Sequence, residues 1–258
     1  MMMEEMVMEE IIVRSTLDHT DQPSLFYFAG EGKPLLVGLH TWSFGRKNQV
    51  RSMLPYAKKL DFNLLLPEFR GANKPSNPNC KQACGSALAI GDIFDAIDYV
   101  SETYKIDRTR IMMLGMSGGG HMALLAAAKN PELFRAVGAV VPLTDMISFH
   151  AYTQSYRSHI EACLGGTPEE REEVYKERSP ISYVDELARV NLKIFHGKFD
   201  RVVPFSHSMN LYNLLCERHP ESRVFLEIFD GAHEIDLESA FYWLVSQLGE
   251  RKATLVTG

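Results

Sequence analysis

The stretch LGMSGGGHMALLAAAKNP, residues 114–131, places four glycines around a single serine. The apolar residues just before the serine, RIMMLG (110–115), predict a short buried strand, and the alanine-rich residues after it predict a helix. Glycine inside such elements costs roughly 0.5–1 kcal/mol relative to alanine. The backbone between this strand and this helix must therefore make a turn or an approach that a side chain would forbid.

Outward from this stretch, strand-like and helix-like segments alternate along most of the chain. Further short apolar runs predict buried strands at residues 34–40, 62–69, 136–143, 192–197 and 224–231. Apolar residues at spacings of three and four predict helices at 90–104 and 237–248. Two more strands, at 10–17 and 24–30, have no helix between them and predict an antiparallel hairpin at the edge of the sheet. The pattern predicts an α/β fold: a mostly parallel sheet of roughly eight strands with helices on both faces.

Residues 144–190 interrupt this alternation. They contain no clear strand, several aromatic residues and the charged run TPEEREEVYKERSP (167–180), which predicts a solvated helix face. An insertion of this length between two strands is where a cap or lid is expected. Since we find no linker or repeat, residues 1–258 are predicted to form one domain with a short cap insertion at about 144–190.

Composition excludes several classes of function. The 258 residues carry a net charge of −6 without a basic cluster, which argues against a nucleic-acid partner. No apolar run approaches the roughly 20 residues that span a bilayer, and the first residues lack the pattern of a signal peptide, so we expect a cytoplasmic protein and no membrane partner. The four cysteines show no zinc-site spacing and are expected to be plain thiols, with a local Cys80–Cys84 disulfide as the alternative. The sequence does not predict an oligomeric state.

Residues 115–119 fit the pattern G-x-S-x-G, which a chain of this length contains by chance roughly one time in ten. Here a predicted strand precedes the motif and a predicted helix follows it. This is the setting of a nucleophile elbow, and a chance match would not be expected to have it. In this interpretation Ser117 is a nucleophile, and Gly115 and Gly119 let strand and helix approach each other. The amide of Gly118 then lies at a helix N-terminus, where it can stabilise an oxyanion. The alternative is a glycine-rich connector without chemistry.

A serine hydroxyl is a weak nucleophile until a base takes its proton, and a third group must orient that base. In this topology the chain order is serine, acid, histidine. Asp200 follows the strand at 192–197, and His233 follows the strand at 224–231, so all three residues are expected at the carboxyl ends of parallel strands. Asp145 is the rival acid, and Asp200 and His233 could also be ordinary loop residues.

Three other histidines receive structural interpretations. We expect His121 to be a structural residue inside the helix behind the serine. His196 is expected to shape the loop that carries the acid, and His207 to lie on a helix surface.

Several motifs together resemble the catalytic domain of prolyl oligopeptidase-type α/β-hydrolases, a family that includes acylaminoacyl peptidases and related esterases. They are LGMSGGGHMALLAA, HGKFDRVVP, DGAHE, RSPISYVDEL (178–187) and HTWS (40–43), and the resemblance runs from about residue 34 to the C-terminus. It implies an α/β-hydrolase fold, with Ser117 as nucleophile, Asp200 as acid and His233 as base. It also implies oxyanion amides from Gly118 and Trp42. Thr41 stands where the family usually has glycine. The amide of Thr41 is therefore the alternative to that of Trp42 as the second donor.

The resemblance and the motif together predict a serine hydrolase that works through an acyl-serine intermediate. The large members of the family carry an N-terminal β-propeller, for which these residues offer no segment. We therefore expect the cap to determine specificity. Of the possible activities, we favour that of an esterase. A serine peptidase acting on short peptides is the alternative, and a catalytically silent binding protein is the third. No metal or organic cofactor is implied. The predicted substrate pocket comprises His40, Thr41, Met116, Tyr152, Tyr156 and Val203.

Overall fold

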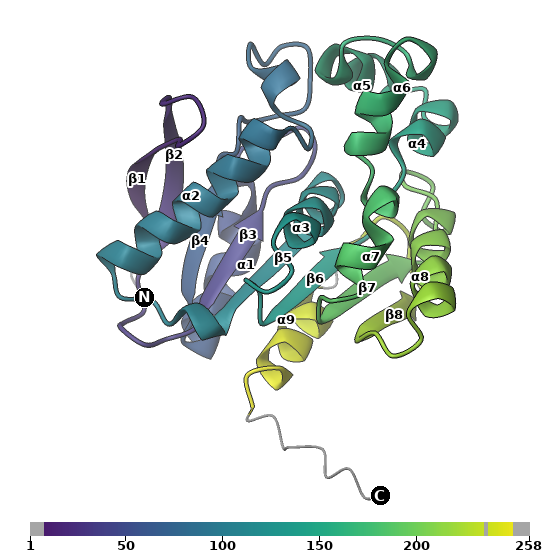
Figure 1. The fold of residues 1–258 in the computed structure, drawn as a ribbon. Coiled ribbons are helices and arrows are strands. Elements are labelled where there is room, and N and C mark those ends of the chain that lie inside the picture. The colour runs from purple at the N-terminus through teal and green to yellow at the C-terminus, as the bar shows by residue number, and fades with distance from the viewer. Residues whose placement is uncertain (1–7, 235–236, 250–258) are drawn as a thin grey trace, which may run out of the picture.

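In the computed structural model, which describes residues 8–234 and 237–249, eight strands form one sheet in the order β1-β2-β4-β3-β5-β6-β7-β8 (Figure 1). Their bounds are β1 Glu9–Arg14, β2 Asp21–Tyr27, β3 Leu35–Leu39, β4 Asn63–Pro67, β5 Ile111–Met116, β6 Ala136–Val140, β7 Leu192–Gly197 and β8 Val224–Phe229. β2 pairs antiparallel with both β1 and β4, and all other neighbours are parallel. The predicted α/β class, the mostly parallel sheet and the antiparallel edge hairpin are confirmed.

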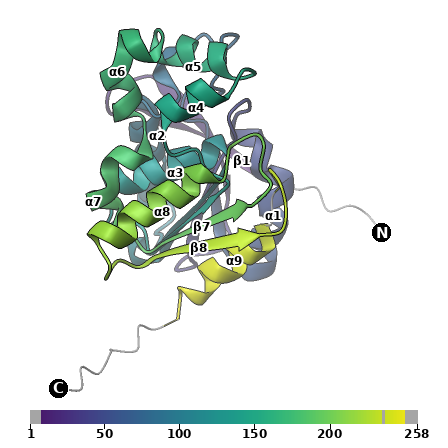
Figure 2. The same ribbon diagram turned by 90° about the vertical axis from the view of Figure 1, so that its right-hand side faces the viewer.

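Helices cover both faces of the sheet, as predicted (Figure 2). On one face lie α2 Ala87–Thr103, α3 Gly118–Lys129, α7 Val184–Leu187 and α8 Ser206–Arg218. On the other lie α1 Val50–Leu60 and α9 Leu237–Ser246. The apolar stripes found in the sequence face the sheet: Ile93 and Ile97 of α2 are fully buried, and so are Ala240 and Phe241 of α9.

The segment 144–190, described throughout, contains helices but no strand. Three of its helices, α4 Met146–Tyr152, α5 Arg157–Leu164 and α6 Pro168–Glu177, gather beyond one end of the sheet, at the top of Figures 1 and 2. The charged run forms α6, whose outer side is solvated, while Tyr175 is fully buried beneath it. These helices share a separate apolar cluster with Trp42 and Val203, which joins them to the rest of the fold.

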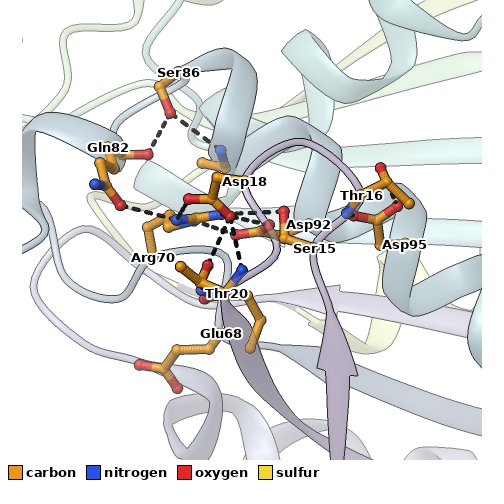
Figure 3. A network of polar contacts seen from close by, with 12 residues as sticks. Ser15, Thr16, Asp18, Thr20, Glu68, Arg70, Gln82, Ser86, Asp92 and Asp95 are labelled. Atoms are coloured by element: carbon orange, nitrogen blue, oxygen red, sulfur yellow. Dashed lines mark hydrogen bonds and ion pairs between the residues drawn. The ribbon is translucent and has the colours of Figure 1, made fainter.

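A buried polar network fixes the edge hairpin and the loop that follows β4 (Figure 3). The guanidinium of Arg70 donates to Asp92 of α2 (Nε to Oδ2, 2.5 Å), to Asp18 of the hairpin turn (Nη1 to Oδ2, 2.7 Å) and to Gln82 (Nη1 to Oε1, 2.8 Å). The side chains of Arg70 and Asp92 are each 1% exposed, so both charges depend on this pairing. The same loop continues to Asn73, whose N–H donates to the carbonyl oxygen of Trp42 (2.8 Å).

Within the described residues, none of the helices combines the length and apolar character that crossing a membrane requires.

Candidate active site

Ser117 occupies the sharp turn between β5 and α3 that the glycine-rich stretch predicts. Its φ of 54° and ψ of −118° lie outside the regions that a residue with a side chain normally adopts. The turn is held from both sides, because the Ser117 N–H donates to the carbonyl oxygen of Val140 (2.9 Å) and its carbonyl oxygen accepts from the His121 N–H (3.0 Å). A serine in a strained conformation between a strand and a helix is the defining feature of a nucleophile elbow.

The glycines around Ser117 are required by close backbone approaches. A Cβ at Gly115 would lie 2.0 Å from the carbonyl oxygen of Gly119, and a Cβ at Gly119 would lie 2.4 Å from the carbonyl oxygen of Leu39. Gly120 packs more loosely, since a Cβ there would lie 3.1 Å from the Cβ of Pro142. Gly115 and Gly119 thus let strand and helix meet, as expected.

The three residues predicted in the order serine, acid, histidine are brought together at the carboxyl ends of β5, β7 and β8. His233 Nε2 lies 3.0 Å from Ser117 Oγ, and His233 Nδ1 lies 2.7 Å from Asp200 Oδ2. Because a carboxylate can only accept, Nδ1 carries the proton and Nε2 offers its lone pair to the serine hydroxyl. This is the arrangement in which a histidine can take a proton from serine.

The loop around Asp200 holds its carboxylate in the ionised form. Oδ1 accepts from the N–H groups of Val202 (2.8 Å) and Val203 (3.0 Å). Burial by itself would raise the pKa of Asp200, but contacts with His196 and His233 outweigh it and hold this pKa well below its usual range. His196 is buried, and its Nε2–H donates to the carbonyl oxygen of Val203 (3.0 Å), which agrees with the expectation that it shapes this loop.

The rival acid, Asp145, lies elsewhere. It is the N-cap of α4, and its Oδ1 accepts from the N–H groups of Ile147 (3.0 Å) and Ser148 (3.1 Å). These are the bonds that a helix N-cap makes. The structure therefore pairs His233 with Asp200 and not with Asp145.

The backbones of Gly118 and Trp42 lie next to each other beside Ser117. A Cβ at Gly118 would lie 2.7 Å from the backbone nitrogen of Trp42, so the two residues are in close backbone contact. The amide of Thr41, the alternative donor, already donates to Asn48 Oδ1 (3.1 Å). The amide of Trp42, by contrast, has no hydrogen-bond acceptor among residues 8–234 and 237–249. Trp42 and Gly118 are thus the amides left available for a ligand, and no sequence motif indicates the role of Asn48.

The residues predicted to form a substrate pocket divide into two groups. Tyr152 and Tyr156 line a pocket of about 350 Å³ together with Arg201 and Val202 of the acid loop, the loop that carries Asp200. The sequence did not suggest that Arg201 and Val202 line a pocket. The described lining of this pocket does not include the other four residues, His40, Thr41, Met116 and Val203.

These four residues have other surroundings. The ring of His40 is buried and stacks on Phe69, with ring centroids 3.8 Å apart. Burial lowers the pKa of His40, and a neutral imidazole can donate to only one of the two carbonyl oxygens that face its nitrogens. The hydroxyl of Thr41 donates to Asn48 (3.0 Å), and Met116 and Val203 are buried.

Two further histidines lie inside the fold. His121 is buried, as expected of a structural residue, and its Nε2–H donates to the carbonyl oxygen of Arg178 (2.7 Å). The prediction that His207 lies on a helix surface is wrong. Its ring is buried where α8 begins, and Nδ1 accepts from the N–H of Thr144 (3.2 Å), because the chain leaving β6 passes over this end of the helix.

Comparison with known proteins places the chain in one family. The model of the prolyl oligopeptidase family matches residues 49–243. Acylamino-acid-releasing enzyme 2 of Oryza sativa subsp. japonica is 23% identical over 239 residues, which cover 88% of this chain and 29% of the rice protein. Inactive dipeptidyl peptidase 10 of Rattus norvegicus is 29% identical over 126 residues, which cover 49% of this chain and 15% of the rat protein. The chain thus spans less than a third of the length of either relative.

A solved structure, that of a Mycobacterium tuberculosis puromycin-hydrolyzing peptidase, superposes with a TM-score of 0.77 at 18% identity. The match covers 94% of this chain and 40% of that one. At this identity the likeness establishes the fold.

Proposed function

This chain belongs to the prolyl oligopeptidase family, and we propose that it is a serine hydrolase that cleaves the amide bond of a short peptide through an acyl-serine intermediate. The sequence favours an esterase, but the family model, the rat relative and the solved structure carry the names of peptidases, and the rice relative is named for releasing acylamino acids, which supports the alternative instead. Ester cleavage by the same residues becomes the second candidate. Since one matching relative is named inactive, the proposal depends on the geometry of this chain's own side chains.

The observation that carries the proposal is the continuous contact from Ser117 through His233 to Asp200. In the proposed mechanism Ser117 Oγ attacks the scissile carbonyl carbon while its proton passes to His233 Nε2, 3.0 Å away. Asp200 keeps the proton of the imidazole on Nδ1 and stabilises the imidazolium that forms. The low pKa of Asp200 keeps its carboxylate charged for this purpose.

In the proposed mechanism, two backbone amides stabilise the negative charge that develops on the substrate oxygen. The Gly118 N–H lies at the start of α3, where the helix dipole also favours negative charge, and the Trp42 N–H lies beside it. Losing one donor of this kind typically raises the barrier by about 2.7–4 kcal/mol. The tetrahedral intermediate then collapses, and His233 gives its proton to the leaving amine. A water molecule repeats the attack on the acyl-serine with His233 as base.

We assign specificity to the cap. Tyr152 and Tyr156 of the cap and Arg201 of the acid loop surround the pocket of about 350 Å³ next to the loop that carries Asp200. Two aromatic rings and a guanidinium can bind an apolar side chain together with a carbonyl group. A peptide residue adjacent to the scissile bond has both features, so the pocket suits the proposed substrate.

The experiment that tests the function compares wild-type protein with Ser117→Ala on aminoacyl-anilides and p-nitrophenyl acyl esters, with fluorophosphonate labelling as a direct readout. We expect wild-type protein to be labelled and to turn over the anilides, and Ser117→Ala to lose both properties. The exposed Ser182 gives a matched control, because Ser182→Ala should keep both. Turnover of esters alone would replace the peptidase by the esterase. A folded wild-type protein without labelling or turnover would contradict the serine hydrolase assignment.

A further inference from the structure

Three of the four cysteines meet where the cap rests on the loop that follows β4. Cys80 begins the short 3₁₀ turn Cys80–Gln82, Cys84 lies just before α2, and Cys163 lies in the cap helix α5. Cys84 and Cys163 lie in the same buried cluster, and the side chain of Cys80 packs against it. Residues 80 and 163 are distant in sequence, so a bond between them would join the cap to the body of the protein.

The backbones around these thiols are held in place by one arginine. Nη1 of Arg178 lies within hydrogen-bonding distance of the carbonyl oxygens of Ala83 (3.2 Å), Cys84 (3.4 Å) and Cys163 (3.2 Å). Cys80 Sγ lies 3.8 Å from the carbonyl oxygen of Ala162, the residue next to Cys163. A disulfide requires two Cα atoms that are already close, and Cys80 Sγ already lies against the backbone of the residue next to Cys163.

We propose that Cys80 and Cys163 form a reversible disulfide bond that fastens the cap helix α5 to the loop before α2, with a low-molecular-weight disulfide such as oxidised glutathione as the oxidant. The thiolate of Cys80 attacks one sulfur of oxidised glutathione, whose S–S bond breaks and releases one glutathione. The thiolate of Cys163 then attacks Cys80 in the mixed disulfide and releases the second glutathione. Two protein thiols are oxidised, one glutathione disulfide is reduced, and the two thiol protons end on the glutathione products.

Burial decides the order of these steps. Cys80 is partly exposed, whereas Cys84 and Cys163 are 1% and 2% exposed, so only Cys80 can meet a solute first. Burial raises the pKa of Cys80, and the hydrogen bond with Cys84, followed by burial, raises that of Cys163. Because the thiolate is the reactive form, the bond should form slowly at neutral pH and faster as the pH rises.

The consequence for activity rests on the proposed function. Helix α5 begins directly after Tyr156, whose ring packs edge-on against Trp42 with centroids 6.1 Å apart. Fixing α5 therefore restrains one wall of the pocket and the residue that supplies an oxyanion amide. We expect the oxidised protein to show a changed KM for bulky anilides, reversed by dithiothreitol.

The test treats the full chain with oxidised glutathione at mildly alkaline pH and maps its disulfides by mass spectrometry of non-reduced peptides. A Cys80–Cys163 peptide is expected, with a Tm raised by roughly 5 °C or more and restored by dithiothreitol. Cys80→Ser and Cys163→Ala should each abolish the peptide and the shift, whereas Cys216→Ser, at an exposed and distant thiol, should keep both.

Two results would overturn the proposal: a Cys80–Cys84 peptide in place of the predicted one, or no cross-link in a sample whose Cys216 has been fully converted to its glutathione adduct. The cross-link should also form in Ser117→Ala. Its formation there separates the disulfide from the hydrolase activity, since either can fail without the other.

Discussion

The conformation of Ser117 is the point where residue chemistry and fold depend on each other most closely. A positive φ is unfavourable for serine, yet two backbone hydrogen bonds and the start of α3 hold it there. The strain directs Oγ toward His233 and leaves the Gly118 amide at the start of the helix. A change that relaxes this turn should therefore remove reactivity before it removes the fold.

Gly115→Ala tests this dependence. The new methyl group would lie 2.0 Å from the carbonyl oxygen of Gly119, which is backbone and cannot rotate away. We expect a loss of about 1–3 kcal/mol in the free energy of unfolding, measured in urea, and loss of fluorophosphonate labelling. Gly249→Ala is the control, because its methyl group meets nothing closer than 3.9 Å and should leave both unchanged. Full labelling of Gly115→Ala would contradict the role given to the close approach.

At this scale the sequence predicted which three side chains lie together better than it predicted the residues around them. Ser117, Asp200 and His233 could be found because the order of motifs and the ends of strands both restrict them. Trp42 was favoured over Thr41 as amide donor only through the resemblance, because the choice depends on a side chain, Asn48, that occupies the Thr41 amide. No local pattern indicates such a contact.

At the scale of elements, the cap helices depend on their ends as much as on their apolar faces. Helix α4 begins at Asp145, whose carboxylate accepts two N–H groups of the first turn. Helix α6 begins with a capping box formed by Thr167 and Glu170. Short helices of this kind are marginal by themselves, so their caps and the apolar cluster beneath them determine whether the cap keeps its shape.

Asp145→Ala separates a helix-capping aspartate from an acid of the active site. We expect it to lower the free energy of unfolding by about 0.5–2 kcal/mol, because two N–H groups lose their acceptor, while turnover stays within a few-fold of wild-type protein. Asp200→Ala should instead lower kcat by about 10⁴-fold, because His233 loses the group that orients it. Equal loss of turnover in the two variants would contradict the pairing of His233 with Asp200.

Sequence periodicity could predict which elements exist but not how elements from distant segments cover one another. The alternation of strands and helices follows from local apolar patterns, and these place the strands to within a few residues. The burial of His207 was missed because it results from Thr144, more than sixty positions earlier, passing over the start of α8. The meeting of Cys163 with Cys80 escaped prediction for the same reason, since α5 and the loop before α2 carry no pattern that pairs them.

At the scale of the whole molecule, the Arg70 network joins the edge hairpin to helix α2 by side-chain contacts that the sheet does not provide. The hairpin β1–β2 lies at the edge of the sheet, and Arg70 ties its turn through Asp18 to α2 through Asp92 (Figure 3). The hydrogen bond from Arg70 lowers the pKa of Asp18 well below its usual range. The network thus stabilises the loop that leads to Asn73 and Trp42.

Arg70→Met should leave the carboxylate of Asp92 buried without its partner. Removing one member of a buried pair typically costs about 3–5 kcal/mol, which we expect as the loss in the free energy of unfolding. Arg14→Met is the matched control on the same hairpin, because Arg14 and Asp21 are 68% and 64% exposed and their pair contributes at most about 1 kcal/mol. Similar losses in the two variants would show that burial of the network contributes little.

Two of the buried histidines, His121 and His207, predict how the molecule responds to acid. Burial lowers the pKa of His121 and of His207 to about 4, from the ordinary value of 6.5. Between these values the unfolded chain binds more protons than the folded one, so stability rises with pH and is lost as the pH falls from 6.5 toward 4. We expect a loss on the order of 3 kcal/mol per histidine over this window. Urea titrations of His121→Gln should give a shallower pH dependence than wild-type protein, and equal slopes would refute the assignment.

The positions of the three active-site residues along the chain have a consequence for the time course of folding. Ser117 and His233 are 116 positions apart, and the base comes after β8, which pairs only with β7 at the edge of the sheet. Contacts between such distant residues form late, because a long loop must close before they are made. If His233 is the base that we propose, a partly folded chain that lacks this edge should have no reactive serine. Fluorophosphonate labelling after dilution from denaturant would therefore report when β8 has joined the sheet, because no label should be incorporated before that step.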